Sequence, residues 1–179
     1  DKKYSILIGT QIIAKGLHFP NVTLVGVINS DIILNFPDFR SGEKTFQLLT
    51  QVSGRAGRGD KKGKVIIQTY EPENNVIKDS KEENYDLFYE KEINSRKVFS
   101  YPPFSKILNI GFSSEDEARL LDISKKFYDE IKSENIELYG PMPSMVYKVQ
   151  KRFRMNIFVK GSKKKIDKFK LFLKKKLNE

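Results

Sequence analysis

The stretch EKTFQLLTQVSGRAGRG, residues 43–59, combines regularly spaced apolar residues with a glycine-rich end. Phe46, Leu49 and Val52 recur at the spacing of one helix face, and the glycines that follow stop a helix. The stretch therefore predicts an amphipathic helix that leads into a loop with two arginines.

Three β-branched runs surround this helix: YSILIG at 4–9, VTLVGVIN at 22–29 and KVIIQTY at 64–70. Two of them are nearly continuously apolar, which is typical of parallel strands covered on both faces. The order strand, loop, strand, helix, strand predicts an α/β fold. It is too short for a complete doubly wound domain, so we expect the chain to be part of a longer protein.

Residues 71–104 carry aromatic side chains at roughly helical spacing and end in YPPF, which predicts one connecting helix and a linker. Beyond them we expect a strand at 105–114, a helix at 115–135 and a strand at 136–140. A turn at GPMPS (140–144), a hairpin at 145–161 and a last helix at 163–177 should follow. This order predicts a small α+β domain of the split β-α-β type. The helix faces expected to be buried are Leu120, Leu121, Phe127, Tyr128 and Ile131, and then Ile166, Phe169, Leu173 and Leu177. The predicted divisions are 1–70, 71–104 and 105–179.

The charge of the chain is concentrated at one end. The net charge is +10, but residues 140–179 hold 13 Lys/Arg against 2 Asp/Glu, and the remainder is close to neutral. Such asymmetry suggests a polyanion partner, most often nucleic acid, and on charge alone a merely solvated basic surface explains it about equally well. The sequence has no window apolar enough to span a bilayer and no signal peptide, so we expect a soluble, intracellular protein.

Arg55 and Arg58 stand three positions apart beyond the predicted helix. Arginine stabilises the charge that spreads over a transferring phosphoryl group. By itself the pair also fits a basic loop. GTQIIAKGLHFP, residues 9–20, precedes it at the end of a predicted strand, and the two together resemble motifs V and VI of superfamily 2 nucleic-acid helicases.

The resemblance extends further, through GKVIIQTYEPE and YPPF, to the PriA family of primosomal replication-restart helicases. It implies a partial RecA-like second helicase lobe, with motifs V and VI on parallel strands, followed by the family's C-terminal domain. The activity it implies is ATP-driven, 3′-to-5′ unwinding of DNA at stalled forks. The location implied is the bacterial cytoplasm, associated with the nucleoid.

The resemblance assigns roles to residues of both motifs. Arg58 would be the arginine finger, with Arg55 beside it at the γ-phosphate. The remaining residues at the nucleotide would be Gln51 and Gly16, and those at DNA phosphates would be Gly9, Thr10 and Lys15. His18 replaces an acid that many relatives in the superfamily carry, and we interpret it as a loop residue and not as a base or ligand.

Other parts of the ATP site are absent from these 179 residues. The sequence contains no phosphate loop and no paired-acid Mg²⁺ motif. The resemblance implies that ATP and Mg²⁺ are held mostly by another lobe, and that zinc-binding cysteines lie upstream of Asp1. We expect no metal site here and no catalysis by this part alone. The implied partners are forked and single-stranded DNA, single-strand binding protein and loading proteins for the replicative helicase.

The basic C-terminal segment YKVQKRFRMNIFVK interleaves aromatic and cationic residues. Side chains alternate in a strand, so Arg152 and Arg154 should share one face while Phe153 takes the other. Candidate phosphate contacts are Lys148, Lys151, Arg152 and Arg154. These arginines could also be merely solvated.

Two further alternatives stay open from the sequence. Asp38, Arg40 and Glu43 precede the motif VI helix; they could couple to motif VI or DNA, but a stabilised helix start is the favoured interpretation. The whole chain could also be a non-enzymatic nucleic-acid-binding protein built on a degenerate helicase lobe. A phosphate loop in the same longer protein would distinguish a helicase from that alternative.

Overall fold

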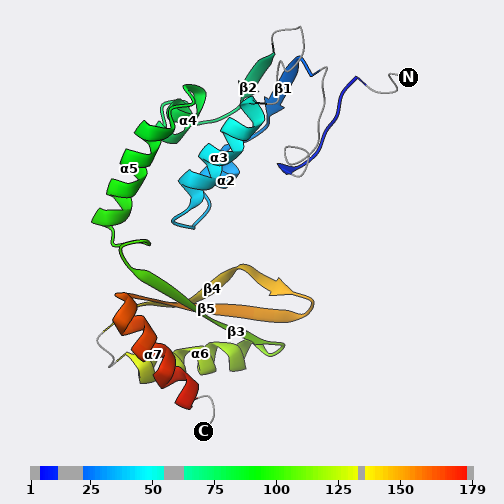
Figure 1. Ribbon diagram of the computed structural model, residues 1–179. Helices are drawn as coiled ribbons and strands as arrows, with labels where there is room; N and C mark the ends of the chain where they lie inside the picture. Colours follow the sequence, from blue (N-terminus) through cyan, green and yellow to red (C-terminus); the bar gives the residue numbers. More distant parts are fainter. Residues whose placement is uncertain (1–4, 12–21, 55–62, 133–135, 177–179) are drawn as a thin grey trace. The chain divides into compact units, whose positions relative to one another are not determined.

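The computed structural model describes residues 5–11, 22–54, 63–132 and 136–176 (Figure 1). The chain divides into two compact units, Asp1–Ser95 and Arg96–Glu179, which are described separately below. The division falls inside the segment 71–104 that the sequence predicts to be a connection.

The first unit contains a parallel pair of strands, β1 (Leu24–Val27) and β2 (Lys64–Ile67), with Leu24 opposite Lys64 and Val27 opposite Ile67. Their location and parallel direction confirm the prediction for 22–29 and 64–70. The prediction that both faces of these strands are covered is wrong, because alternate residues of each strand are exposed, Leu24 and Ile66 among them. The apolar runs belong to a pair of strands of which one face lacks a packed layer among the described residues.

The strand predicted at 4–9 is also wrong for the residues that the structure describes. Residues 5–10 belong to no strand, and Ile8 is 86% exposed. A strand needs a hydrogen-bonded neighbour, and in the described part of the chain β1 and β2 pair only with each other. β-Branched residues alone do not supply that neighbour.

The described part of the first unit also contains the helices α2 (Asp31–Leu34), α3 (Ser41–Ser53), α4 (Asn75–Lys81) and α5 (Tyr85–Val98), the last of which ends just beyond the unit. As predicted, Phe46, Leu49 and Val52 of α3 are buried. The ring of Phe46 stacks on that of Phe88 in α5, with centroids 4.2 Å apart. Ile77 of α4 joins this core.

The single connecting helix predicted at 71–104 is in fact two helices. Glu83 has a left-handed backbone (φ 52°), which interrupts helical geometry. The next residue, Asn84, restarts it, because its side-chain oxygen accepts a hydrogen bond from Leu87 N–H at 3.0 Å. Two neighbouring local signals therefore separate α4 from α5.

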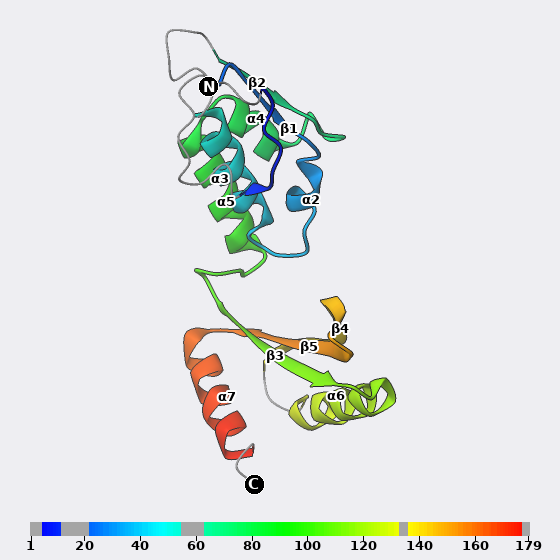
Figure 2. The ribbon, with the colours of Figure 1, turned by 90° about the vertical axis from the view of Figure 1, so that its right-hand side faces the viewer.

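The second unit is a three-stranded antiparallel sheet with two helices on one face (Figures 1 and 2). The strands are β3 (Lys106–Ser114), β4 (Glu137–Val149) and β5 (Arg152–Gly161), in the order β3-β5-β4. The helices are α6 (Glu117–Ile131) and α7 (Lys163–Lys176). The elements follow in the predicted order, except that the strand predicted at 136–140 and the first strand of the predicted hairpin form one continuous strand, β4.

The core of this unit lies between the sheet and the two helices. Ile157 and Val159 of β5 are fully buried there against Ile131 of α6 and Ile166 and Phe169 of α7. Of the residues predicted to be buried, Leu120, Ile131, Ile166 and Phe169 are buried, and Phe127, Tyr128 and Leu173 pack partly buried against the core. The prediction is wrong at Leu121, which is 46% exposed, and Leu177 lies outside the described residues. Ser124, one turn further along α6, is buried in its place.

The turn predicted at GPMPS is wrong, because β4 runs through it with shifts of register between Tyr139 and Met142 and between Pro143 and Lys148. β4 is an edge strand, where a proline without an N–H is tolerated. Gly140 has φ +111°, and a Cβ there would lie 2.7 Å from the backbone oxygen of Asn156. Glycine therefore permits the first irregularity.

None of the described helices combines the length and the apolar character needed to cross a membrane.

Candidate nucleotide and nucleic-acid interface

Gln51 lies in the last turn of α3 with an exposed side chain, while the adjacent Val52 is buried. The helix ends at Ser53, and the N–H of Gly54 donates to the carbonyl oxygen of Thr50 at 3.1 Å. The packed face of α3 therefore directs Gln51 to solvent directly before the predicted arginine pair.

The other residues predicted at the nucleotide and in the motif V loop are not brought together by the described structure. Gly9 and Thr10 are exposed and belong to no helix or strand. Five predicted or discussed positions lie outside the described residues: Lys15, Gly16, His18, Arg55 and Arg58. Their roles stay predictions.

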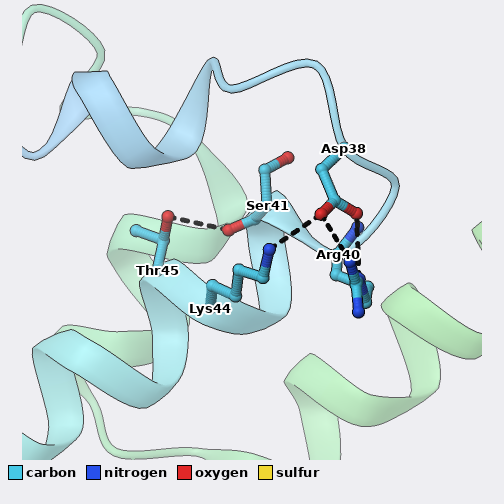
Figure 3. Close-up of polar contacts among 5 residues, drawn as sticks. All are labelled: Asp38, Arg40, Ser41, Lys44 and Thr45. Carbon is cyan, nitrogen blue, oxygen red and sulfur yellow. Dashed lines mark hydrogen bonds and ion pairs between the residues drawn. The ribbon is translucent and has the colours of Figure 1, made fainter. Parts of the chain in front are cut away.

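The start of α3 carries a cluster of charges around Asp38 (Figure 3). One carboxylate oxygen accepts hydrogen bonds from Arg40 Nε and the Arg40 backbone N–H, at 3.0 and 2.9 Å. The other accepts from an Arg40 terminal nitrogen at 2.8 Å and from Lys44 Nζ at 2.7 Å. Hydrogen bonds from Arg40 are the main cause that lowers the pKa of Asp38 far below its usual range.

This cluster bears on the group Asp38, Arg40 and Glu43 that the sequence singled out. Glu43 accepts a hydrogen bond from Gln47 at 3.1 Å, one turn along the helix, and its negative charge adds to the causes that raise the pKa of Arg40. Asp38 ties the loop to the first turn of α3 through Lys44. These contacts agree with a stabilised helix start, and they orient the helix that carries Gln51.

A second connection, not foreseen from the sequence, involves the buried Asp31 at the start of α2. Its carboxylate accepts hydrogen bonds from Thr69 Oγ1 at 2.5 Å and from the backbone N–H of Tyr70 at 3.0 Å. The Thr69 bond is the main cause of a lowered Asp31 pKa. Ser30 donates to the carbonyl oxygen of Gln68 beside it, at 3.1 Å. The carboxyl end of β2 is thereby fixed to α2.

In the second unit, β4 and β5 meet in a two-residue turn formed by Gln150 and Lys151. Both residues have positive φ, 46° and 69°, between the paired residues Val149 and Arg152. This is the geometry of a type I′ hairpin turn, whose twist matches that of the strands. Lys151 thus stands at the tip of the hairpin.

The face of the sheet opposite α6 and α7 is called the open face here. Arg152 and Arg154 of β5 are exposed and share this face. Met155, the next residue, is buried on the opposite face, which the helices cover. Phe153 takes the other side, as predicted. Lys148 pairs directly with Phe153 in the ladder and places Nζ 4.3 Å from its ring centroid. The four predicted cations therefore do not share one face.

Arg152 and Arg154 also differ in their partners. The Arg152 guanidinium donates to the hydroxyl and the carbonyl oxygen of Ser113, at 3.0 and 2.9 Å, and lies 3.9 Å from a carboxylate oxygen of Glu115. Arg154 forms no ion pair within the described parts of the chain. Arg154 is accordingly the freer of the two to bind a phosphate.

The irregular part of β4 forms a shallow hollow of about 420 Å³ on the open face beside Arg154. Between Pro143 and Lys148, β4 has more residues than the facing part of β5, so it arches away from the ladder. Met145 and Val146 supply apolar walls, and Asn156 supplies an amide. Cationic, polar and apolar groups thus meet at one place on the open face.

Lys160, at the other end of β5, differs from Arg154 because its ammonium group is already engaged by other residues of the chain. Its ammonium lies 2.9 Å from Glu137 and donates to the carbonyl oxygen of Phe99 at 3.2 Å. It also lies over the rings of Tyr101 and Tyr139, at 5.5 and 5.4 Å. The Glu137 hydrogen bond is the main cause of its raised pKa. The count of basic residues therefore overstates the cations that are open to a polyanion.

No group of three or more potential metal ligands occurs among the residues whose placement is described.

Comparison with known sequence families accounts for both units. Residues 1–60 match the helicase conserved C-terminal domain, and residues 97–178 match the primosomal protein N C-terminal domain. These matches cover the motif V and VI region and almost all of the second unit.

The relatives include Replication restart protein PriA of Rickettsia conorii and of Bacillus subtilis. They are 45% and 46% identical to this chain over 159 and 161 residues, which is 89% and 88% of it. A protein of the same name from Chlamydia trachomatis is 40% identical over 162 residues, 88% of this chain. The aligned regions make up 24%, 20% and 21% of those relatives. The resemblance found in the motifs is confirmed, and the chain belongs to the PriA family of replication restart proteins.

Proposed function

We propose that this chain is the C-terminal part of an ATP-dependent DNA helicase that moves 3′ to 5′, recognises stalled replication forks and restarts replication through primosome assembly. The observation that carries the proposal is the match to proteins named for replication restart. At 159 aligned residues of 179, it extends through both compact units. A chain that shared only a helicase-like lobe would not be similar in its second unit as well.

In this proposal the first unit contributes part of a RecA-like second lobe. The parallel pair of β1 and β2 with the amphipathic α3 supports this assignment. Residues 1–70 would form the lobe part, 71–104 the connection, and 105–179 a split β-α-β domain. The Asp38 and Asp31 clusters would hold α3 and the end of β2 in place beside the nucleotide.

Arg58 would stabilise the γ-phosphoryl group as the arginine finger, with Arg55 beside it. Gln51 and Gly16 would line the same nucleotide cleft. The exposed side chain of Gln51 supports this, because no hydrogen bond to another described residue engages it. ATP and Mg²⁺ would be held mostly by residues outside this chain, so these 179 residues alone would hydrolyse no ATP.

DNA would be contacted from both units. Gly9, Thr10 and Lys15 would bind phosphates in the first unit. In the second, Arg154 on the open face and Lys151 at the hairpin tip would make the main contacts, with Arg152 and Lys148 at their margins. Phosphate contacts without base readers favour recognition of DNA structure over sequence.

The resemblance also carries proposals for the whole protein. Single-strand binding protein and proteins that load the replicative helicase would be its partners, in the bacterial cytoplasm and near the nucleoid. Zinc would be bound by cysteines of another region, since this chain has none.

The proposal is tested by measuring ATP hydrolysis and strand separation by the full-length protein with fork DNA. We expect hydrolysis that depends on DNA and is coupled to unwinding, and neither activity from this chain alone. A full-length protein that binds forks but hydrolyses no ATP would instead be a non-enzymatic binding protein.

A further inference from the structure

Helix α7 carries an unusual charge. Eight of its fourteen residues are lysines and one, Asp167, is an acid. Lys176 pairs with Glu130, and it is the only one of the eight with an ion pair among the described residues. The neighbouring α6 mixes acids with bases and contains an internal pair between Lys126 and Asp122.

The lysines of α7 cover the side of the helix that faces away from the core. Ile166 and Phe169 are buried and fix the orientation of the helix. Lys164, Lys168 and Lys175 follow at spacings of four and seven residues, which puts them in one outward row. Leu171, which is 63% exposed, belongs to the same row. A second row, Lys163, Lys170 and Lys174, runs beside it.

This arrangement is unfavourable for the helix on its own. Like charges four residues apart, as in Lys164 and Lys168 or Lys170 and Lys174, repel one another. The first turn contains lysines and no acid, against the direction of the helix dipole. The apolar face nevertheless holds α7 on the sheet. A polyanion along the outward rows would relieve the repulsion.

The outward row also lies on a different side of the unit from Arg154. α6 and α7 share one face of the sheet (Figures 1 and 2), whereas Arg154 points from the open face. The sheet and a helix about 10 Å across separate the two groups of cations. One straight segment of nucleic acid cannot contact both.

We propose that α7 is a second nucleic-acid surface, which binds the phosphate backbone of a duplex arm while the open face around Arg154 holds a single strand of the same branched DNA. The inference rests on the proposed function in taking DNA as the polyanion. From Lys164 to Lys175 the outward row extends about 16 Å along the helix axis. Duplex DNA presents about nine phosphate charges over that length, a far denser array than a single strand offers.

The test uses the full-length protein with Lys164→Gln, Lys168→Gln and Lys175→Gln combined. A matched control combines Lys125→Gln, Lys126→Gln and Lys132→Gln, which removes the same charge from exposed positions at α6. Fluorescence anisotropy measures binding of a fork with a duplex arm and of a single-stranded oligonucleotide, each over a series of salt concentrations. Circular dichroism verifies that both variants keep the helical content of the parent.

For the α7 variant we expect fork affinity to fall at least about tenfold and the slope of log K against log salt to flatten by about 2–3. Its affinity for the single strand should stay within about twofold, and the α6 control should behave as the parent on both ligands. An unchanged fork slope, or an equal loss on fork and single strand, would overturn the two-surface proposal. Binding of polyglutamate is measured in the same way. If the α7 variant loses binding of polyglutamate but keeps binding of the fork, α7 is a surface for acidic protein, and the two-surface proposal is overturned. A parent protein that binds no DNA would contradict the proposed function itself.

Discussion

The carboxylate of Asp38 binds the guanidinium of Arg40 through both of its oxygens, at 3.0 and 2.8 Å, and the second of these oxygens also accepts a hydrogen bond from Lys44. We predict that Asp38→Asn lowers the free energy of unfolding by about 1 kcal/mol, a modest amount because Arg40 and Lys44 are about half exposed. Chemical denaturation measures it. Glu73→Gln, which removes an exposed pair with Lys78, is the control and should change stability little. Equal effects of the two changes would refute a special role for Asp38.

The lowered pKa of Asp38 makes its contribution to the free energy of unfolding depend on pH. Arg40 holds the folded-state pKa below the ordinary value near 4, so the stabilisation is fully present above about pH 4 and is lost as the pH falls towards the folded-state pKa. The difference in stability between the parent and Asp38→Asn should therefore be constant from about pH 5 to 7 and shrink below about pH 4. Denaturation at a series of pH values measures it. A difference that grows on acidification would contradict the assignment.

The core of the second unit depends on Ile157, which is fully buried in β5 between the sheet and both helices. We predict that Ile157→Ala costs about 3 kcal/mol, because it removes buried methyl groups and leaves a cavity. Leu121→Ala, at the helix position wrongly predicted to be inward, should cost less than about 1 kcal/mol. Thermal unfolding compares them. Similar losses would mean that Leu121 is part of the core after all.

Arg154 is the cation of the open face that lacks an ion pair in the described structure and lines the hollow. We predict that Arg154→Ala in the full-length protein weakens binding of single-stranded DNA and lowers its salt slope by about 1, since one phosphate contact is lost. Arg119→Ala, an exposed arginine at the start of α6, is the matched control. Identical salt slopes for parent and Arg154→Ala would leave Arg154 as a merely solvated residue.

Local patterns in the sequence predicted most of the elements, and long-range contacts account for the errors. The periodicity of Phe46, Leu49 and Val52 gave α3 and its buried face correctly. The predictions of a strand at residues 5–9 and of a turn at GPMPS were wrong, because strand formation depends on which neighbour is available for pairing. Leu121 was wrong because the exact rotation of α6 on the sheet is set by packing, not by hydropathy alone.

The candidate site shows the same division. Motif spacing identified the family, and alternation along β5 correctly separated Arg152 and Arg154 from Phe153. Sequence could not show that Ser113 and Glu115 already engage Arg152, or that Glu137 neutralises Lys160, because those partners are distant along the chain. The link from Asp31 to Thr69 spans 38 residues, and no local signal announces it.

The most direct test of the central claim is the rate of DNA-stimulated ATP hydrolysis by the full-length protein carrying Arg58→Ala. If this chain supplies the arginine finger of a helicase, the rate should fall by about three orders of magnitude while nucleotide binding changes far less. Gln47→Ala, at an exposed position one turn before Gln51, should leave the rate nearly unchanged. A parental rate in Arg58→Ala would contradict the claim.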